Sequence, residues 1–325
     1  MAIPTGGMNK GGTLGSRTAW AAVAWLLLLS ALAGPAAAKA PVVVVTVRPL
    51  TALVAAVMQG IGKPTTLIPT DQRPETFELH NQDEDTLREA DLVFWVGPSL
   101  EASLVQPFAD LEIGARIAEL DDTPGLLVFQ RRRGGEWDVP AIAGQAPAPA
   151  TAHGDADGHI WLDADNVKLL IGRIAEALID VDFADAEVYR SNAETLRKKV
   201  DALDRELADG LSSFHDRPFL QMHDDFQYFE ARYNLAGAGA VGLEVDALPS
   251  SQLKALVARV ARLHAVCVVG DEPGDSVDLQ AISTAAGVRT ALIDPYGADY
   301  SETPDLYFQT LRGIAAQFAH CLSGP

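Results

Sequence analysis

The sequence predicts an α/β fold of two lobes, each built on a parallel-type sheet, with a long rigid backbone helix joining them. Short β-branched runs alternate with helical segments over residues 41–97, and the same alternation returns over residues 217–293. A long segment without proline separates the two regions. The 325 residues suffice for two cores, and the 48% of apolar residues excludes a disordered chain.

The first lobe is predicted over residues 39–183. A continuous β-branched run at 41–47 is typical of a buried parallel strand, and apolar residues at helical spacing follow it as far as a glycine stop. Further strands are predicted at TTLIP (65–69) and DLVFWVG (91–97), with the short polar helix DEDTLREA (83–90) between them.

Residues 122–158 interrupt this alternation. They are rich in proline, alanine and glycine, which predicts a long mobile loop within the first lobe. The three arginines at 131–133 are interpreted as a solvated surface, because so acidic a chain is unsuited to binding nucleic acid.

A linking helix is predicted over residues 184–213. The apolar positions share one helical face, and a helix over 184–209 would be about 39 Å long at 1.5 Å per residue. These positions are Leu196, Val200, Leu203, Leu207 and Leu211.

The second lobe is predicted over residues 214–325. Helical segments separate its strands, and a helix over 303–322 closes it. The strands are RPFLQM (217–222), GAGAVGL (237–243), AVCVVG (265–270) and VRTALI (288–293).

The N-terminal segment resembles a secretory signal. Lys10 and Arg17 precede an apolar run of 15 residues at 19–33, and small residues then offer cleavage after Ala38 or Ala40. The run is short for a membrane span, so residues 1–38 are predicted to be removed and the mature protein to be soluble and periplasmic. Their removal takes away two basic and no acidic residues, so the formal net charge of −19 becomes −21.

Two cysteines, Cys267 and Cys321, are present. In an oxidising compartment an even pair favours a disulfide, although two buried thiols remain an alternative. A metal site built on this pair is disfavoured, because the cysteines lack close spacing.

Candidate metal ligands lie where predicted strands end. His223 directly follows the strand at 217–222, and Asp294 directly follows the strand at 288–293. Ligands of open α/β sheets collect at the carboxyl ends of strands, so both side chains are placed toward a cleft between the lobes. His159 lies at the end of the long loop, just before the linking segment.

Six motifs, in this order, resemble the zinc branch of the metal-binding solute-binding proteins of bacterial ABC importers. They are VTVRPL, ADLVFWVGPSLE, DGHIWLD, MHDDFQYF, GDEPG and DPYGADY. The resemblance implies two α/β lobes around a backbone helix, with a metal site in the inter-lobe cleft. It also implies a periplasmic receptor, not an enzyme, that captures Zn²⁺ and delivers it to a membrane permease. A monomer is the expected state, and a periplasmic metallochaperone is a possible further partner.

Carried over by position, the resemblance assigns three metal ligands, His159, His223 and Asp294. It also pairs Cys267 with Cys321 in a disulfide. The family's first ligand histidine falls on Glu75, whereas His80 lies five residues later and is expected to point away. A carboxylate oxygen can bind Zn²⁺, so Glu75 completes the predicted set.

Several alternatives stay open at this point. Water could replace Glu75, and Asp271 and Glu272 also follow a strand, where the family segment more often orients a ligand histidine. His153 is at most an auxiliary ligand. Two carboxylates shift the preference toward Mn²⁺ or Fe²⁺, although zinc should still bind more tightly than manganese. A secreted metallohydrolase is the rival class, and it is disfavoured because no HExxH motif is present.

Overall fold

The computed structural model describes residues 1–3, 6–7, 39–110, 114–133, 135–137, 156–241, 250–271 and 274–324. Residues 1–39 and 40–325 form two separate units, and the second unit contains both sheets. The predicted signal segment, residues 1–38, lies almost entirely outside the described residues. Among the residues that are described, no helix is long and apolar enough to cross a membrane.

The first sheet has four parallel strands in the order β2-β1-β3-β4. The strands are β1 (Val43–Val45), β2 (Thr65–Thr66), β3 (Leu92–Trp95) and β4 (Arg116–Glu119). The helices of this region are α2 (Arg48–Val57), α3 (Asn81–Glu89) and α4 (Val105–Asp110). Every residue of β1 and β3 is buried, which explains why their sequences are continuously apolar. Strand β4 was not predicted, because it is an edge strand with two exposed residues and no apolar run.

The second sheet repeats this arrangement, with four parallel strands in the order β6-β5-β7-β8. The strands are β5 (Phe219–Gln221), β6 (Gly237–Ala240), β7 (Cys267–Gly270) and β8 (Arg289–Leu292). The intervening helices are α7 (Gln227–Tyr233), α8 (Ser250–Leu263) and α9 (Asp275–Ala286). The predicted α/β class with two parallel sheets is confirmed.

The strand order fixes where a ligand can bind. In each sheet the chain first moves to one side of the starting strand and then returns to its other side. The two strands at that reversal are β1 and β3 in the first sheet, and β5 and β7 in the second. Loops at the carboxyl ends of such strands diverge and leave a crevice, so side chains that follow β5 and β7 are well placed for binding.

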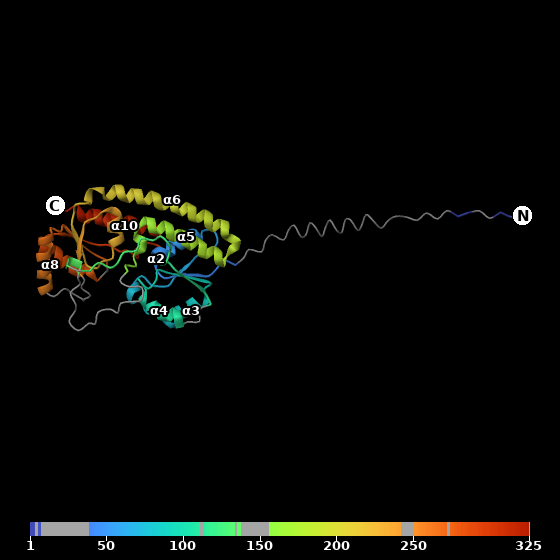
Figure 1. Cartoon of the computed structure of the whole chain (residues 1–325), viewed down its shortest axis with the longest axis horizontal. Helices are drawn as coiled ribbons and strands as arrows, with labels where there is room; N and C mark the ends of the chain where they lie inside the picture. The colour runs from blue at the N-terminus through green and yellow to red at the C-terminus, as the bar shows by residue number, and fades with distance from the viewer. Residues whose placement is uncertain are drawn as a thin grey trace. The chain divides into compact units, whose positions relative to one another are not determined.

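The predicted long helix is α6 (Ala186–Leu211), with 26 residues or about 39 Å. It packs against α5 (Ala164–Val181) and α10 (Leu306–Leu322), as Figure 1 shows. The five predicted apolar positions of α6 are all buried, as its sequence period requires. The lobe boundaries at residues 183 and 214 stay a prediction.

The disulfide between Cys267 and Cys321 joins the start of β7 to the end of α10, with the two Cα atoms 5.6 Å apart. Both cysteines are fully buried. The bond therefore holds the closing helix on the second sheet, and the predicted pairing is confirmed.

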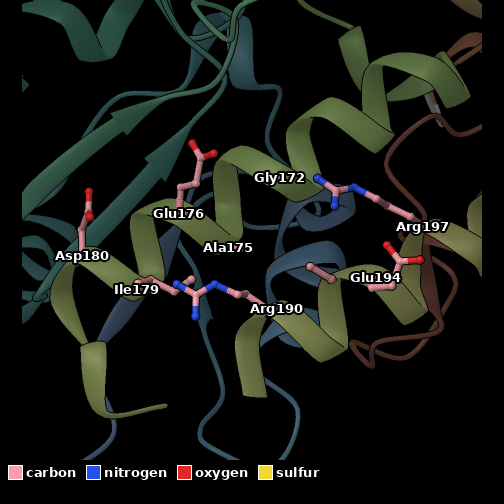
Figure 2. A pocket seen from close by; sticks show the side chains of 9 residues that line it. Gly172, Ala175, Glu176, Ile179, Asp180, Arg190, Glu194 and Arg197 are labelled. Carbon is pink, nitrogen blue, oxygen red and sulfur yellow. The ribbon is translucent and has the colours of Figure 1, made fainter. Parts of the chain in front are cut away.

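A groove of about 430 Å³ lies between α5 and α6 (Figure 2). Gly172 and Arg197 face each other across it, and a Cβ atom at position 172 would meet the Arg197 guanidinium. Gly172 is the single glycine between residues 163 and 209. The residues that line the groove include no histidine or cysteine, so it differs in chemistry from the site described next.

Candidate metal site

The register of the second sheet brings His223 and Asp271 together. Strands β5 and β7 are parallel neighbours with Gln221 opposite Val269, so residues two positions further on also lie side by side. His223 Nδ1 lies 2.8 Å from Asp271 Oδ1. This contact matches the expected role of Asp271 as a residue that orients a histidine, and it leaves Nε2 of His223 available to a metal.

His159 is held in a similar way, immediately before the short 3₁₀ helix η4 (Ile160–Leu162). Its side chain is fully buried, and its Nδ1 lies 2.8 Å from Asp157 Oδ1. The same carboxylate oxygen accepts a hydrogen bond from the backbone N–H of His159 at 3.0 Å. A carboxylate on Nδ1 fixes the ring and again turns Nε2 toward the candidate site.

Three oxygen-bearing side chains surround His159 Nε2. The hydroxyl of Tyr296 lies 3.2 Å away, Glu75 Oε1 lies 3.7 Å away and Asp225 Oδ1 lies 3.9 Å away. The Tyr296 hydroxyl also donates to Glu75 Oε1 at 3.4 Å. Nitrogen and oxygen donors therefore converge on one point, as a divalent transition metal requires.

Glu75 and His80 lie in different surroundings. Glu75 lies in the 3₁₀ helix η1 (Pro74–Thr76), which turns its carboxylate toward His159. His80 precedes α3, where its backbone N–H donates to Asp83 Oδ2 at 2.9 Å. The His80 side chain is 71% exposed, and its described contacts include none of the predicted ligands.

Asp294 is the predicted ligand that lies apart. It follows β8, one strand beyond β7, and its carboxylate accepts hydrogen bonds from the backbone N–H groups of Tyr296, at 2.7 Å, and Ala298. Within the described part of the chain it contacts neither histidine. Its turn nevertheless reaches the site, because Tyr296 contacts His159 and Pro295 O accepts a hydrogen bond from Trp161 Nε1 at 3.2 Å.

Two residues of the site were missed by the sequence reasoning, Asp225 and Arg73. Asp225 is only 4% exposed, and it lies two residues after His223 in the segment that follows β5. The acidic pair at 224–225 gave no signal that distinguished one carboxylate from the other. Arg73 precedes η1, and its guanidinium contacts Glu75, Asp225 and Asp271 at 3.3, 3.5 and 3.4 Å.

The structure therefore forms two adjacent groups of metal-binding side chains. Each group has its donor atoms within 4.8 Å of one another. One group is Glu75, His159 and Asp225, and the other is His223, Asp271 and Asp275. Arg73 contacts carboxylates of both groups, so the two form one charged centre.

The carboxylates control the charge of the histidines. Burial alone would lower the pKa of His159, but the charges of Asp225, Asp157 and Glu75 outweigh it and raise the pKa to about 9. Burial likewise opposes the charge of His223, yet its hydrogen bond to Asp271 raises that pKa to about 9. Both rings are thus protonated at neutral pH in the absence of metal.

The pKa values of the two aspartates that face each other are shifted in opposite directions. Burial would raise the pKa of Asp225, but the charges of His159 and Arg73 lower it below its usual range. Burial and the neighbouring charge of Asp225 raise the pKa of Asp271. Asp225 is therefore the permanent anion of the pair.

The long loop contacts the second sheet through residues that were predicted to be solvated. Arg132 stacks on Trp137, 3.5 Å from the ring centroid, and binds Asp224 and Glu230. Since Asp224 directly follows His223, this loop is anchored beside the site. The candidate residues His153 and Glu272 lie outside the described residues.

Known proteins resemble this chain in sequence and in fold. The family described as "Zinc-uptake complex component A periplasmic" (ZnuA) matches residues 43–321. The high-affinity zinc uptake system protein ZnuA of Brucella suis is 32% identical over 305 residues, covering 86% of this chain and 91% of that protein. The protein of the same name from Paracoccus denitrificans is 31% identical over 320 residues, covering 91% and 97%.

The fold is shared with a solved structure as well. A crystal structure of ZnuA matches with a TM-score of 0.71 at 22% identity, covering 87% of this chain and 100% of that one. This likeness supports the two-sheet arrangement around the long helix. Sequence and fold together lead to one conclusion: the chain belongs to the ZnuA family of periplasmic zinc-uptake components.

Proposed function

We propose that Glu75, His159, His223 and Asp294 bind the zinc ion that this protein carries. The family consists of zinc-uptake receptors rather than enzymes, so the chain is a solute-binding protein of an ABC importer and not a hydrolase. The ligand assignment rests on one observation, the hydrogen-bonding arrangement that the two histidines have in common. Each binds a carboxylate through Nδ1 and keeps Nε2 for a metal.

The fourth ligand has two candidates, and Asp294 is proposed on its place in the family pattern. Its carboxylate offers about four lone-pair positions, so it can accept its two backbone hydrogen bonds and still bind a metal. Asp225 is the second candidate, because its Oδ1 already lies 3.9 Å from His159 Nε2.

Zinc is the cargo. The donor set of two histidines and two carboxylates also suits Mn²⁺ or Fe²⁺, but zinc should outcompete both at equilibrium. The receptor delivers zinc to the permease of an ABC importer. We further propose that it acts as a monomer, accepts zinc from a periplasmic metallochaperone, and is exported by residues 1–38 with cleavage after Ala38 or Ala40.

A competitive zinc titration of the metal-stripped mature protein tests the ligand assignment. Glu75→Ala, His159→Ala and His223→Ala should each weaken binding at least tenfold, or about 1.4 kcal/mol. His80→Ala is the matched control, because this exposed side chain lies near η1 but outside the site. Unaltered affinity in Glu75→Ala, or a loss in His80→Ala, would refute the assignment of Glu75.

The same titration separates the two carboxylates. Asp294→Asn should weaken zinc binding at least tenfold if Asp294 is the fourth ligand, and Asp225→Asn should then have the smaller effect. The opposite ranking would transfer the fourth position to Asp225.

A further inference from the structure

A cation of the protein itself, the Arg73 guanidinium, lies beside the proposed zinc site and contacts its carboxylates. The three nitrogen atoms of the Arg73 guanidinium face three different carboxylates. Nε lies 3.3 Å from Glu75 Oε2, Nη2 lies 3.5 Å from Asp225 Oδ2, and Nη1 lies 3.4 Å from Asp271 Oδ2. The Arg73 side chain is 29% exposed, whereas the side chains of Asp225 and Asp271 are 6% and 4% exposed, so these contacts are largely shielded from water.

These contacts join parts of the chain that are distant in sequence. Arg73 and Glu75 belong to the segment between β2 and α3, beside the first sheet. Asp225 and Asp271 follow β5 and β7 of the second sheet, 152 and 198 residues further along the chain. Arg73 is thus an ionic bridge from the segment that carries one proposed ligand to the sheet that carries another.

The guanidinium and a metal ion would bind the same two carboxylate groups. Arg73 contacts Glu75 Oε2 and Asp225 Oδ2, whereas Glu75 Oε1 and Asp225 Oδ1 face His159 Nε2. Glu75 and Asp225 are two of the three residues whose donor atoms converge around His159 Nε2. A zinc ion binds nitrogen and oxygen donors at about 2.0–2.2 Å, so it would lie within a few ångströms of the guanidinium as it is now placed. Two cations at that separation repel each other strongly in a site shielded from water.

We propose that Arg73 is a resident cation, which holds the carboxylates of the metal site in the metal-free protein and is displaced when zinc binds. This inference rests on the proposed function. In the metal-free state Arg73 prevents Glu75, Asp225 and Asp271 from repelling one another. In the bound state zinc takes over that role, so Arg73 lowers the affinity for zinc and eases its release to the permease.

Substitution of Arg73 tests the proposal. In a competitive zinc titration, Arg73→Gln should bind zinc at least fivefold more tightly than the wild-type protein, because no internal cation has to leave. Arg73→Lys keeps the charge and should restore affinity toward the wild-type value. Arg88→Gln is the matched control, since Arg88 also pairs with two carboxylates, Glu84 and Asp85, but does so on the surface of α3.

Thermal unfolding provides an independent measurement. The metal-free Arg73→Gln protein should melt at a lower temperature than the metal-free wild type. Zinc should raise the melting temperature of Arg73→Gln by more than it raises that of the wild type. A purely structural arginine would instead lower the melting temperatures of the metal-free and zinc-bound forms alike. That result, or zinc affinity that is unchanged or weaker in Arg73→Gln, would overturn the proposal.

If Arg73→Gln does not fold, a crystal structure of the zinc-bound wild-type protein tests the proposal instead. In that structure Arg73 should lie beyond ion-pair distance, about 4 Å, from both Glu75 and Asp225. An arginine that still contacts both carboxylates beside the bound zinc would overturn the proposal. Failure of the wild-type protein to bind zinc at all would refute the proposed function instead.

Discussion

Zinc binding at pH 7 should release about two protons, one each from His159 and His223. The neighbouring carboxylates raise the pKa of both rings to about 9 in the metal-free protein, so both rings are largely protonated at pH 7. Zinc needs the lone pair of Nε2, so each ring must lose one proton on binding.

The size of the effect follows from the pKa values. Deprotonating a group two pH units below its pKa costs about 2.7 kcal/mol, so the two histidines together reduce the zinc affinity at pH 7 by about 5 kcal/mol. The dissociation constant should fall about a hundredfold for each pH unit between 6.5 and 8, and level off above pH 9.

The metal-free protein should show the opposite trend in stability. A pKa raised above the ordinary histidine value of 6.5 contributes stability that is complete below pH 6.5 and is lost as the pH rises through about 9. Raising the pH within this window should therefore strengthen zinc binding and, through these two groups, destabilise the metal-free form.

Calorimetric titration in buffers of different ionisation enthalpy measures the number of protons released. His223→Asn should release about one proton fewer than the wild type, and His80→Ala should release the same number. Release of less than about half a proton by the wild type, with an affinity independent of pH from 6.5 to 8, would refute the assigned histidine charges.

Two further predictions concern stability. Reducing the disulfide between Cys267 and Cys321, 54 residues apart, should lower the free energy of unfolding by about 4 kcal/mol in urea titrations with and without reductant; a loss below about 1 kcal/mol would contradict the loop-closure account. Thr46 donates a hydrogen bond to the fully buried carboxyl group of Glu101. Burial raises the pKa of Glu101 from 4.5 to about 7, so the stability that Glu101 contributes is lost as the pH rises from 4.5 through 7. In urea unfolding, Thr46→Val should therefore lower the free energy of unfolding by about 1.5–3 kcal/mol at pH 8 and by less at pH 5. The surface control Thr86→Val should show no such difference between the two pH values. An equal loss for Thr46→Val at both pH values would refute the assigned charge of Glu101.

The strands and helices were predictable where apolar residues follow a regular pattern in the sequence. The buried strands β1 and β3 appear as continuous apolar runs, and α6 appears as one apolar face repeated over 26 residues. Strand β4 lacks both signals, since it lies at a sheet edge with its arginine exposed. Local patterns thus identify elements that are buried along their whole length and miss those that are half covered.

The site was predictable only in part, for a related reason. His223 and Asp271 could be placed at the ends of strands, and register alone then brings them together. Arg73 and Asp225 become neighbours through tertiary folding across 152 residues, and no spacing in the sequence expresses that contact.

The charges around the site show that Arg73 does more than neutralise the carboxylates. In the metal-free protein two protonated histidines and Arg73 oppose the carboxylates of Glu75, Asp225 and Asp157. Exchange of the two histidine protons for one Zn²⁺ leaves the net charge of the site unchanged, so net charge alone does not require Arg73 to move. What requires it is the short distance between guanidinium and zinc, because both would bind the carboxylates of Glu75 and Asp225 and would repel each other there. The number of protons released on zinc binding therefore tests the charges of the two histidines, and the zinc affinity of Arg73→Gln tests whether Arg73 is displaced by zinc. Either inference can fail while the other stands.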